Sequence, residues 1–124
     1  MINSVVVVGR VVEQPKKLKT ETGVIFSNLV LAVQRPFKNM DGDYDVDYIN
    51  CLIWEALVDS CCEYCTKGSI IGVKGRLQTK INEVNFGTEA KNIKGMDVIA
   101  EKVTFIRIIR ENNTIKEEKE WENK

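Results

Sequence analysis

An alternating pattern occupies residues 47–54, Asp-Tyr-Ile-Asn-Cys-Leu-Ile-Trp. Aromatic and amide side chains take every second position, apart from one leucine, and apolar side chains lie between them. Their β-branched and aromatic content predicts a β-strand, in which successive side chains point to opposite faces. Tyr48, Asn50 and Trp54 then share one face with Leu52. Two flat rings around an amide form a stacking surface for flat ligands such as nucleic-acid bases, at ~1–3 kcal/mol per base. The alternative is that Tyr48 and Trp54 cover a second hydrophobic layer, which Leu52 between them would favour.

A third aromatic residue, Phe37, stands between Arg35 and Lys38 in a connection rich in turn residues. A core position for an aromatic flanked by two cations is hard to justify. A stacking residue beside phosphate contacts is one interpretation, and a ring that anchors the loop is the other.

Two further patterns resemble metal sites. Asp41, Asp43, Asp45 and Asp47 alternate around Gly42, but the glycine is misplaced for a calcium loop and the closing glutamate is missing. The four cysteines, Cys51, Cys61, Cys62 and Cys65, equal the number that a structural zinc takes. Three of them follow a helical pattern and Cys51 lies on an apolar strand face, so we expect reduced, buried thiols. We predict no metal and no cofactor.

Enzyme signatures are not found. The chain has no histidine, which removes the commonest general base, and it has no glycine loop ending in Gly-Lys-Ser/Thr. The carboxylates cluster without an accompanying base or nucleophile motif. We therefore expect a binding protein rather than an enzyme.

The composition indicates one globular domain of moderate size: 124 residues, 44% hydrophobic and 29% charged. The formal net charge is zero, which argues mildly against a nucleic-acid partner, although residues 112–124 carry an acidic excess and leave the rest weakly positive. No apolar run approaches the ~20 residues needed to span a membrane, and residues 1–8 lack signal-peptide features. We expect no membrane association and a cytoplasmic location.

The order of the expected elements predicts an all-β fold. Strands are expected at 5–12, 24–34, 47–54, 69–79 and 96–109, with a helix after Trp54 that ends before Gly68 and a long hairpin over 80–95. Five strands with one helix between the third and fourth are the order of an OB-fold barrel. We predict this domain at 1–110, followed by a charged, disordered tail at 111–124. The first strand is apolar on both faces, so a partner subunit is expected to cover one of them.

Several of these segments resemble the bacterial single-stranded DNA-binding protein family. Four collinear blocks carry the resemblance, at 1–10, 31–37, 47–54 and 67–79, with a weaker match at 96–105. The resemblance implies an OB-fold, a homotetramer, and sequence-tolerant binding and protection of single-stranded DNA during replication, recombination and repair.

The resemblance also implies roles for individual residues. By position, Phe37, Tyr48 and Trp54 match base-stacking residues, and Phe86 is the aromatic nearest to a further stacking position in the hairpin. Basic residues that match or flank backbone-contacting positions are Arg10, Arg35, Lys38, Lys67, Arg76 and Lys80.

The chain departs from the family in three places. The hairpin is longer and lacks the further aromatic that family members usually carry near Asn82, so only Phe86 remains nearby. Glu55 and Ala56 follow the tryptophan where family members usually carry basic or polar residues. Residues 117–124 are acidic with one aromatic but close on lysine, so recruitment of repair and replication proteins through the tail is not expected. The alternative function is an OB-fold protein-interaction module that has lost strong DNA binding.

Overall fold

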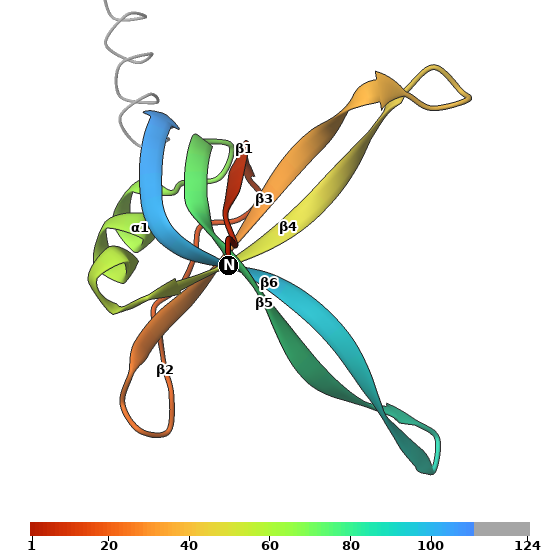
Figure 1. Ribbon diagram of the computed structural model, residues 1–124. Helices are drawn as coiled ribbons and strands as arrows, with labels where there is room; N and C mark the ends of the chain where they lie inside the picture. The colour runs from red at the N-terminus through yellow and green to blue at the C-terminus, as the bar shows by residue number, and fades with distance from the viewer. Residues whose placement is uncertain (111–124) are drawn as a thin grey trace, which may run out of the picture.

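The computed structural model describes residues 1–110, and the predicted disordered tail at 111–124 lies outside the described residues. Figure 1 shows a small barrel from which two long hairpins project. The strands are β1 (Val5–Val11), β2 (Leu18–Lys19), β3 (Ile25–Lys38), β4 (Tyr44–Trp54), β5 (Ile70–Phe86) and β6 (Glu89–Arg107). A 3-10 turn at Glu55–Leu57 leads into the short helix α1 (Val58–Tyr64).

The strand pairings close the sheet into a barrel. The strand order is β1-β5-β6-β4-β3-β2, and an additional pairing of β1 with β3 joins the two sides. All pairs are antiparallel except β4 with β6, which pair in parallel only at Cys51–Val98 and Leu52–Ile99. The five long strands and the helix between β4 and β5 confirm the predicted OB-fold.

The largest side chains that fill the barrel interior are branched aliphatic residues from β3, β4 and β5. Leu29, Leu31, Ile53, Ile71 and Val73 are fully buried. The helix adds buried Val58 and Cys61 to the same cluster, so α1 packs onto the barrel core. The expected burial of the thiols is confirmed for Cys51, Cys61 and Cys65, and all four cysteines are free.

Two hairpins extend beyond the barrel because β4 and β6 pair over only two residues and then diverge (Figure 1). The β3–β4 arm comprises residues 33–47, and the β5–β6 arm comprises residues 79–96. The second arm is paired without interruption down to Phe86 and Glu89, so the predicted hairpin is confirmed. The turn-rich connection expected around Phe37, between strands at 24–34 and 47–54, is shorter than predicted, because β3 continues to Lys38 and β4 starts at Tyr44.

The helix is also shorter than the sequence pattern suggested, because residues 55–57 form a 3-10 turn. Glu55 has φ 46°, the left-handed backbone region that favours glycine. No helix within residues 1–110 is long and apolar enough to cross a membrane. The same residues hold no group of three or more cysteine or acidic side chains arranged to bind a metal ion.

Candidate nucleic-acid interface

The outward face of β4 presents the aromatic side chains that the sequence pattern placed there. Tyr48 is 69% exposed and Trp54 37% exposed, whereas Cys51 and Ile53 between them are fully buried. The alternation along the strand is therefore as predicted. Leu52 is only half-buried, so these residues form an accessible surface rather than a covered second layer.

Trp54 is supported by an aromatic residue of the neighbouring strand. Phe26 lies directly opposite Trp54 in the β3–β4 pairing, and their ring centroids are 5.4 Å apart with an interplanar angle of 34°. A tilted aromatic pair of this kind orients both rings. Sequence reasoning missed Phe26, although its outward position in the alternation of β3 was a usable signal.

The β3–β4 register extends this surface beyond the two aromatic residues. Directly opposed residues of an antiparallel pair share a face of the sheet. Leu52 lies opposite Asn28, Asn50 opposite Val30, and Tyr48 opposite Ala32. We call the outward residues Phe26, Asn28, Val30, Tyr48, Asn50, Leu52 and Trp54 the β3–β4 platform.

A polar cluster borders the platform on the β6 side. The Asn50 side-chain amide and the Lys80 ammonium both donate hydrogen bonds of 2.9 Å to Asp97 Oδ1. Asp97 is 8% exposed, so its charge needs these partners. Lys80 therefore lies beside the platform, but its charge is engaged by a carboxylate. The sequence did not predict that Asp97 is buried, because an acidic residue at the start of an apolar strand is usually exposed to solvent.

Arg76 also lies on the platform side of the barrel. It pairs with Ile99 across β5–β6, and Ile99 in turn neighbours Leu52 on β4. Its guanidinium donates a 2.8 Å hydrogen bond to the Gln78 side chain, and no ion pair engages it in residues 1–110. Arg76 therefore retains charge and donors for an anionic ligand.

Arg35 already has an acidic partner. Its Nε and Nη2 atoms donate hydrogen bonds to both carboxylate oxygens of Asp47 at 2.9–3.2 Å, and Nη1 lies 3.8 Å from Asp45. The hydrogen bonds lower the pKa of Asp47 and raise the pKa of Arg35. Arg35 therefore joins the two strands of the β3–β4 arm, and a phosphate would have to compete with Asp47.

The remaining predicted aromatic residues lie on the two arms. Phe37 is 61% exposed on the β3–β4 arm, where the Lys38 ammonium lies 5.9 Å from the Tyr44 ring. Phe86 is 55% exposed near the end of the β5–β6 arm, with the Lys91 ammonium 5.8 Å from its ring. Both phenylalanine rings are accessible, and that of Phe86 lies beside a cation, but neither belongs to the platform.

The last two predicted basic residues lie near the start of β5. Arg10 donates a 3.3 Å hydrogen bond to the Gly68 carbonyl, so it has a role in joining β1 to this connection. It also lies opposite Ala32, one strand beyond Tyr48. Lys67 is exposed in the turn after α1. The structure thus groups Tyr48, Trp54, Arg76 and Lys80 with the platform, and it places the other predicted residues at its margins or on the arms.

An exposed aromatic platform on a barrel face, bordered by arginine and lysine, suits a flat and anionic polymer. Residues 2–106 match the family described as "Single-strand binding protein family". The chain belongs to this family. The match covers the barrel and both arms, so every predicted site residue lies within it.

Named relatives agree with the family assignment. The chain is 40% identical to the "Single-stranded DNA-binding protein" of Halalkalibacterium halodurans over 106 residues, which cover 86% of this chain and 61% of the relative. It is 38% identical to "Single-stranded DNA-binding protein B" of Bacillus subtilis over 106 residues, which cover 86% of this chain and 91% of that relative. The aligned part therefore spans less than two thirds of the first relative and nearly all of the second.

Proposed function

We propose that this protein binds and protects single-stranded DNA without strong sequence preference. The observation that carries the proposal is the exposed Trp54 ring, supported by half-buried Phe26 on the platform, together with membership of the single-strand binding protein family. Bases stack on flat rings through their π-faces, which all four bases have, so stacking does not select a sequence. Binding of this kind is not catalysis.

Phosphate contacts would come from the basic residues around the platform. Arg76 and Lys67 have no acidic partner within residues 1–110, so they are the first candidates. Lys80 can contribute only if its ammonium leaves Asp97 or contacts both groups, and Arg35 faces the same competition from Asp47. This partial neutralisation predicts fewer phosphate contacts than the number of basic residues suggests.

The two arms would lengthen the path of the bound strand. Phe37 and Phe86 are exposed aromatic residues on opposite arms, and each arm also carries lysines. We assign DNA binding to residues 1–110 as one domain. A DNA partner places the protein with the nucleoid in the cytoplasm and implies roles in replication, recombination and repair.

We also infer that the chain forms a homo-oligomer, with a tetramer as the state that the family resemblance implies. Val6 is 68% exposed, Val8 51% and Ile106 54%, all on the barrel face formed by β1, β5 and β6. Val8 and Ile106 both approach Gly72, so they belong to one surface. Exposed branched aliphatic residues that adjoin one another are typical of a subunit interface.

Titration with a long oligothymidylate tests DNA binding. The chain has two tryptophans, Trp54 and Trp121, so the Trp121→Phe variant leaves Trp54 as the only one. We expect its fluorescence to be strongly quenched by the single strand and little by a duplex, and the quenching to weaken as salt rises because phosphate contacts release counterions. Trp54→Ala should reduce affinity by roughly tenfold, equivalent to ~1.4 kcal/mol, without unfolding the domain.

The same titration identifies failure of the proposal. Absence of quenching and of any mobility shift at low salt would contradict DNA binding and favour a protein-interaction module. If the affinity for the single strand is unchanged in Trp54→Ala, Trp54 does not stack a base. The stacking residues would then be the exposed aromatic residues of the arms.

A further inference from the structure

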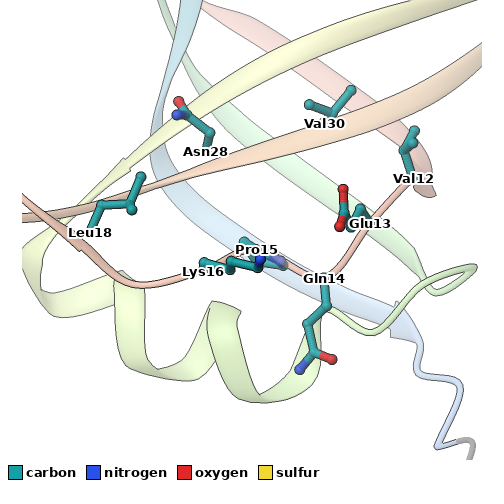
Figure 2. Close-up of a pocket in the computed structure, with 8 residues that line it drawn as sticks. All are labelled: Val12, Glu13, Gln14, Pro15, Lys16, Leu18, Asn28 and Val30. Atoms are coloured by element: carbon teal, nitrogen blue, oxygen red, sulfur yellow. The ribbon is translucent and has the colours of Figure 1, made fainter.

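A pocket of about 360 Å³ lies between β3 and the connection that joins β1 to β2 (Figure 2). This volume falls within the range of small-ligand sites, about 300–1,000 Å³. Its apolar lining comes from Val12, Pro15, Leu18 and Val30. None of these residues was identified as a site residue from the sequence.

The loop wall of this pocket is held in place by contacts that point away from it. Gln14 extends toward α1 in Figure 2, where its amide donates a 2.7 Å hydrogen bond to the Cys62 carbonyl. The Ser27 hydroxyl donates a 2.7 Å hydrogen bond to the Lys16 carbonyl from the other side. Lys17 forms an ion pair of 3.0 Å with the carboxylate of Asp59 on α1. The pocket is thus formed before any ligand arrives, which lowers the entropic cost of binding.

The pocket is continuous with the platform. Asn28 and Val30, which line it, lie directly opposite Leu52 and Asn50 on the same face of the sheet. On its other side, Leu18 lies opposite Phe26, the partner of Trp54. A strand that stacks a base on Trp54 can therefore reach the pocket by crossing a single β-strand.

The polar lining indicates how a nucleotide would be oriented there. Asn28 offers both a donor and an acceptor, and Glu13 offers an acceptor, which match the mixed donors and acceptors on base edges. The Glu13 carboxylate repels phosphate. Lys16 is exposed beside the pocket and has no acidic partner within residues 1–110, so it attracts phosphate to the outside.

We propose that this pocket is a base-binding subsite, which takes one base of the single strand that stacks on Trp54. The base lies between the apolar walls with its polar edge toward Asn28 and Glu13, and the backbone passes Lys16. This inference rests on the proposed function and adds a defined subsite to it.

Methyl NMR of the full chain with an oligothymidylate tests the subsite directly. A base in the pocket should shift the methyl resonances of Val12, Leu18 and Val30 through its ring current, while those of Val73 in the barrel core stay unchanged. Asn28→Leu removes the polar edge and narrows the pocket, so we expect affinity to fall about five- to tenfold. Asn92→Leu makes the same chemical change outside the pocket, at an exposed asparagine opposite Glu83 on the β5–β6 arm, so it measures the effect on affinity of losing an asparagine elsewhere on the path of the strand.

The outcomes separate this subsite from the proposed function. If the wild-type chain binds DNA but the three pocket methyls do not shift, the subsite is excluded and DNA binding stands. Equal affinity of Asn28→Leu and the wild type, with Trp54→Ala still weakened, would also exclude it. A wild-type chain that binds no single strand would overturn both proposals.

Discussion

Trp54 has two immediate neighbours that affect how it can bind a base. Phe26 supports one side of its ring, and Glu55 follows it in the chain with a left-handed backbone. A left-handed conformation costs a non-glycine residue of order 1 kcal/mol or more. Glu55 also places a negative charge next to the surface proposed to approach phosphates. Both effects can be separated by substitution.

Glu55→Gln should increase affinity for single-stranded DNA by a few-fold at low salt without changing the thermal midpoint, because it removes only the charge. Glu55→Gly should increase affinity equally and raise the midpoint by several degrees, because about 1 kcal/mol of strain is also relieved. Fluorescence titration and thermal unfolding measure the two effects. Affinities that do not change in either variant would show that the carboxylate does not face the bound strand.

The buried thiol of Cys51 predicts a loss of stability at high pH. Burial raises its pKa to about 12, and the nearby Asp97 charge adds to the rise. In the unfolded chain a cysteine titrates near pH ~8.5. A raised pKa means that the stabilisation is complete below about pH 8.5 and is lost as pH rises toward 12, at about 1.4 kcal/mol per pH unit.

Denaturant unfolding of the wild type and of Cys51→Val between pH 7 and pH 10.5 tests this expectation. The wild type should lose stability relative to Cys51→Val above about pH 8.5, since valine has no proton to lose. All other titratable groups are the same in the two proteins, so their contributions to the comparison cancel. Parallel pH profiles would show that the thiolate can be solvated in the folded barrel.

At the scale of elements, the crossing of β5 and β6 depends on Gly75. The register between the two strands shifts between Lys74 and Gly75, and a Cβ atom at Gly75 would lie 1.9 Å from the Ile99 carbonyl oxygen. No side chain fits at that distance, so the backbone would have to move. The bend at this position lets the sheet coil into the barrel before the β5–β6 arm begins.

Gly75→Ala should therefore destabilise the domain by ~2 kcal/mol or more or prevent folding, because the clash is with backbone. Gly72→Ala is the matched control on the same strand, since its added Cβ would meet no atom closer than 3.5 Å. Thermal unfolding by circular dichroism compares the two variants. If Gly75→Ala is as stable as Gly72→Ala, the backbones of β5 and β6 can move apart at Gly75 without loss of stability.

Some element boundaries followed the sequence and others did not. The strand at 47–54 and the helix region after it could be predicted, because alternation and helical spacing are local properties. The extension of β3 to Lys38 could not, since Pro36 and the surrounding turn residues favour a loop. The bidentate contact of Arg35 with Asp47 joins the two strands of the arm at this point. Such a contact depends on pairing across the hairpin.

For the whole molecule, the exposed face of β1, β5 and β6 predicts self-association. Val8→Asp should reduce the molar mass in solution to a smaller oligomer or a monomer, because an unpaired carboxylate is costly to bury in an apolar interface. Val46→Asp, at a similarly exposed valine on the β3–β4 arm, should leave the mass unchanged. Light scattering after size exclusion measures both, and circular dichroism confirms folding. If the molar mass of Val8→Asp equals that of the wild type, this face does not form the subunit interface.

By itself, the sequence determined the barrel order, the outward aromatic residues of β4 and the buried cysteines, because each follows from local periodicity. Only the tertiary structure decided which charges are available. Asp47 and Asp97 engage Arg35 and Lys80 across strand pairs, and no spacing along the chain reveals that. The same is true of the pocket between β3 and the β1–β2 connection, whose walls come from segments that only barrel closure brings together. Strand alternation acts between near neighbours, whereas ion pairing and pocket formation depend on non-local register.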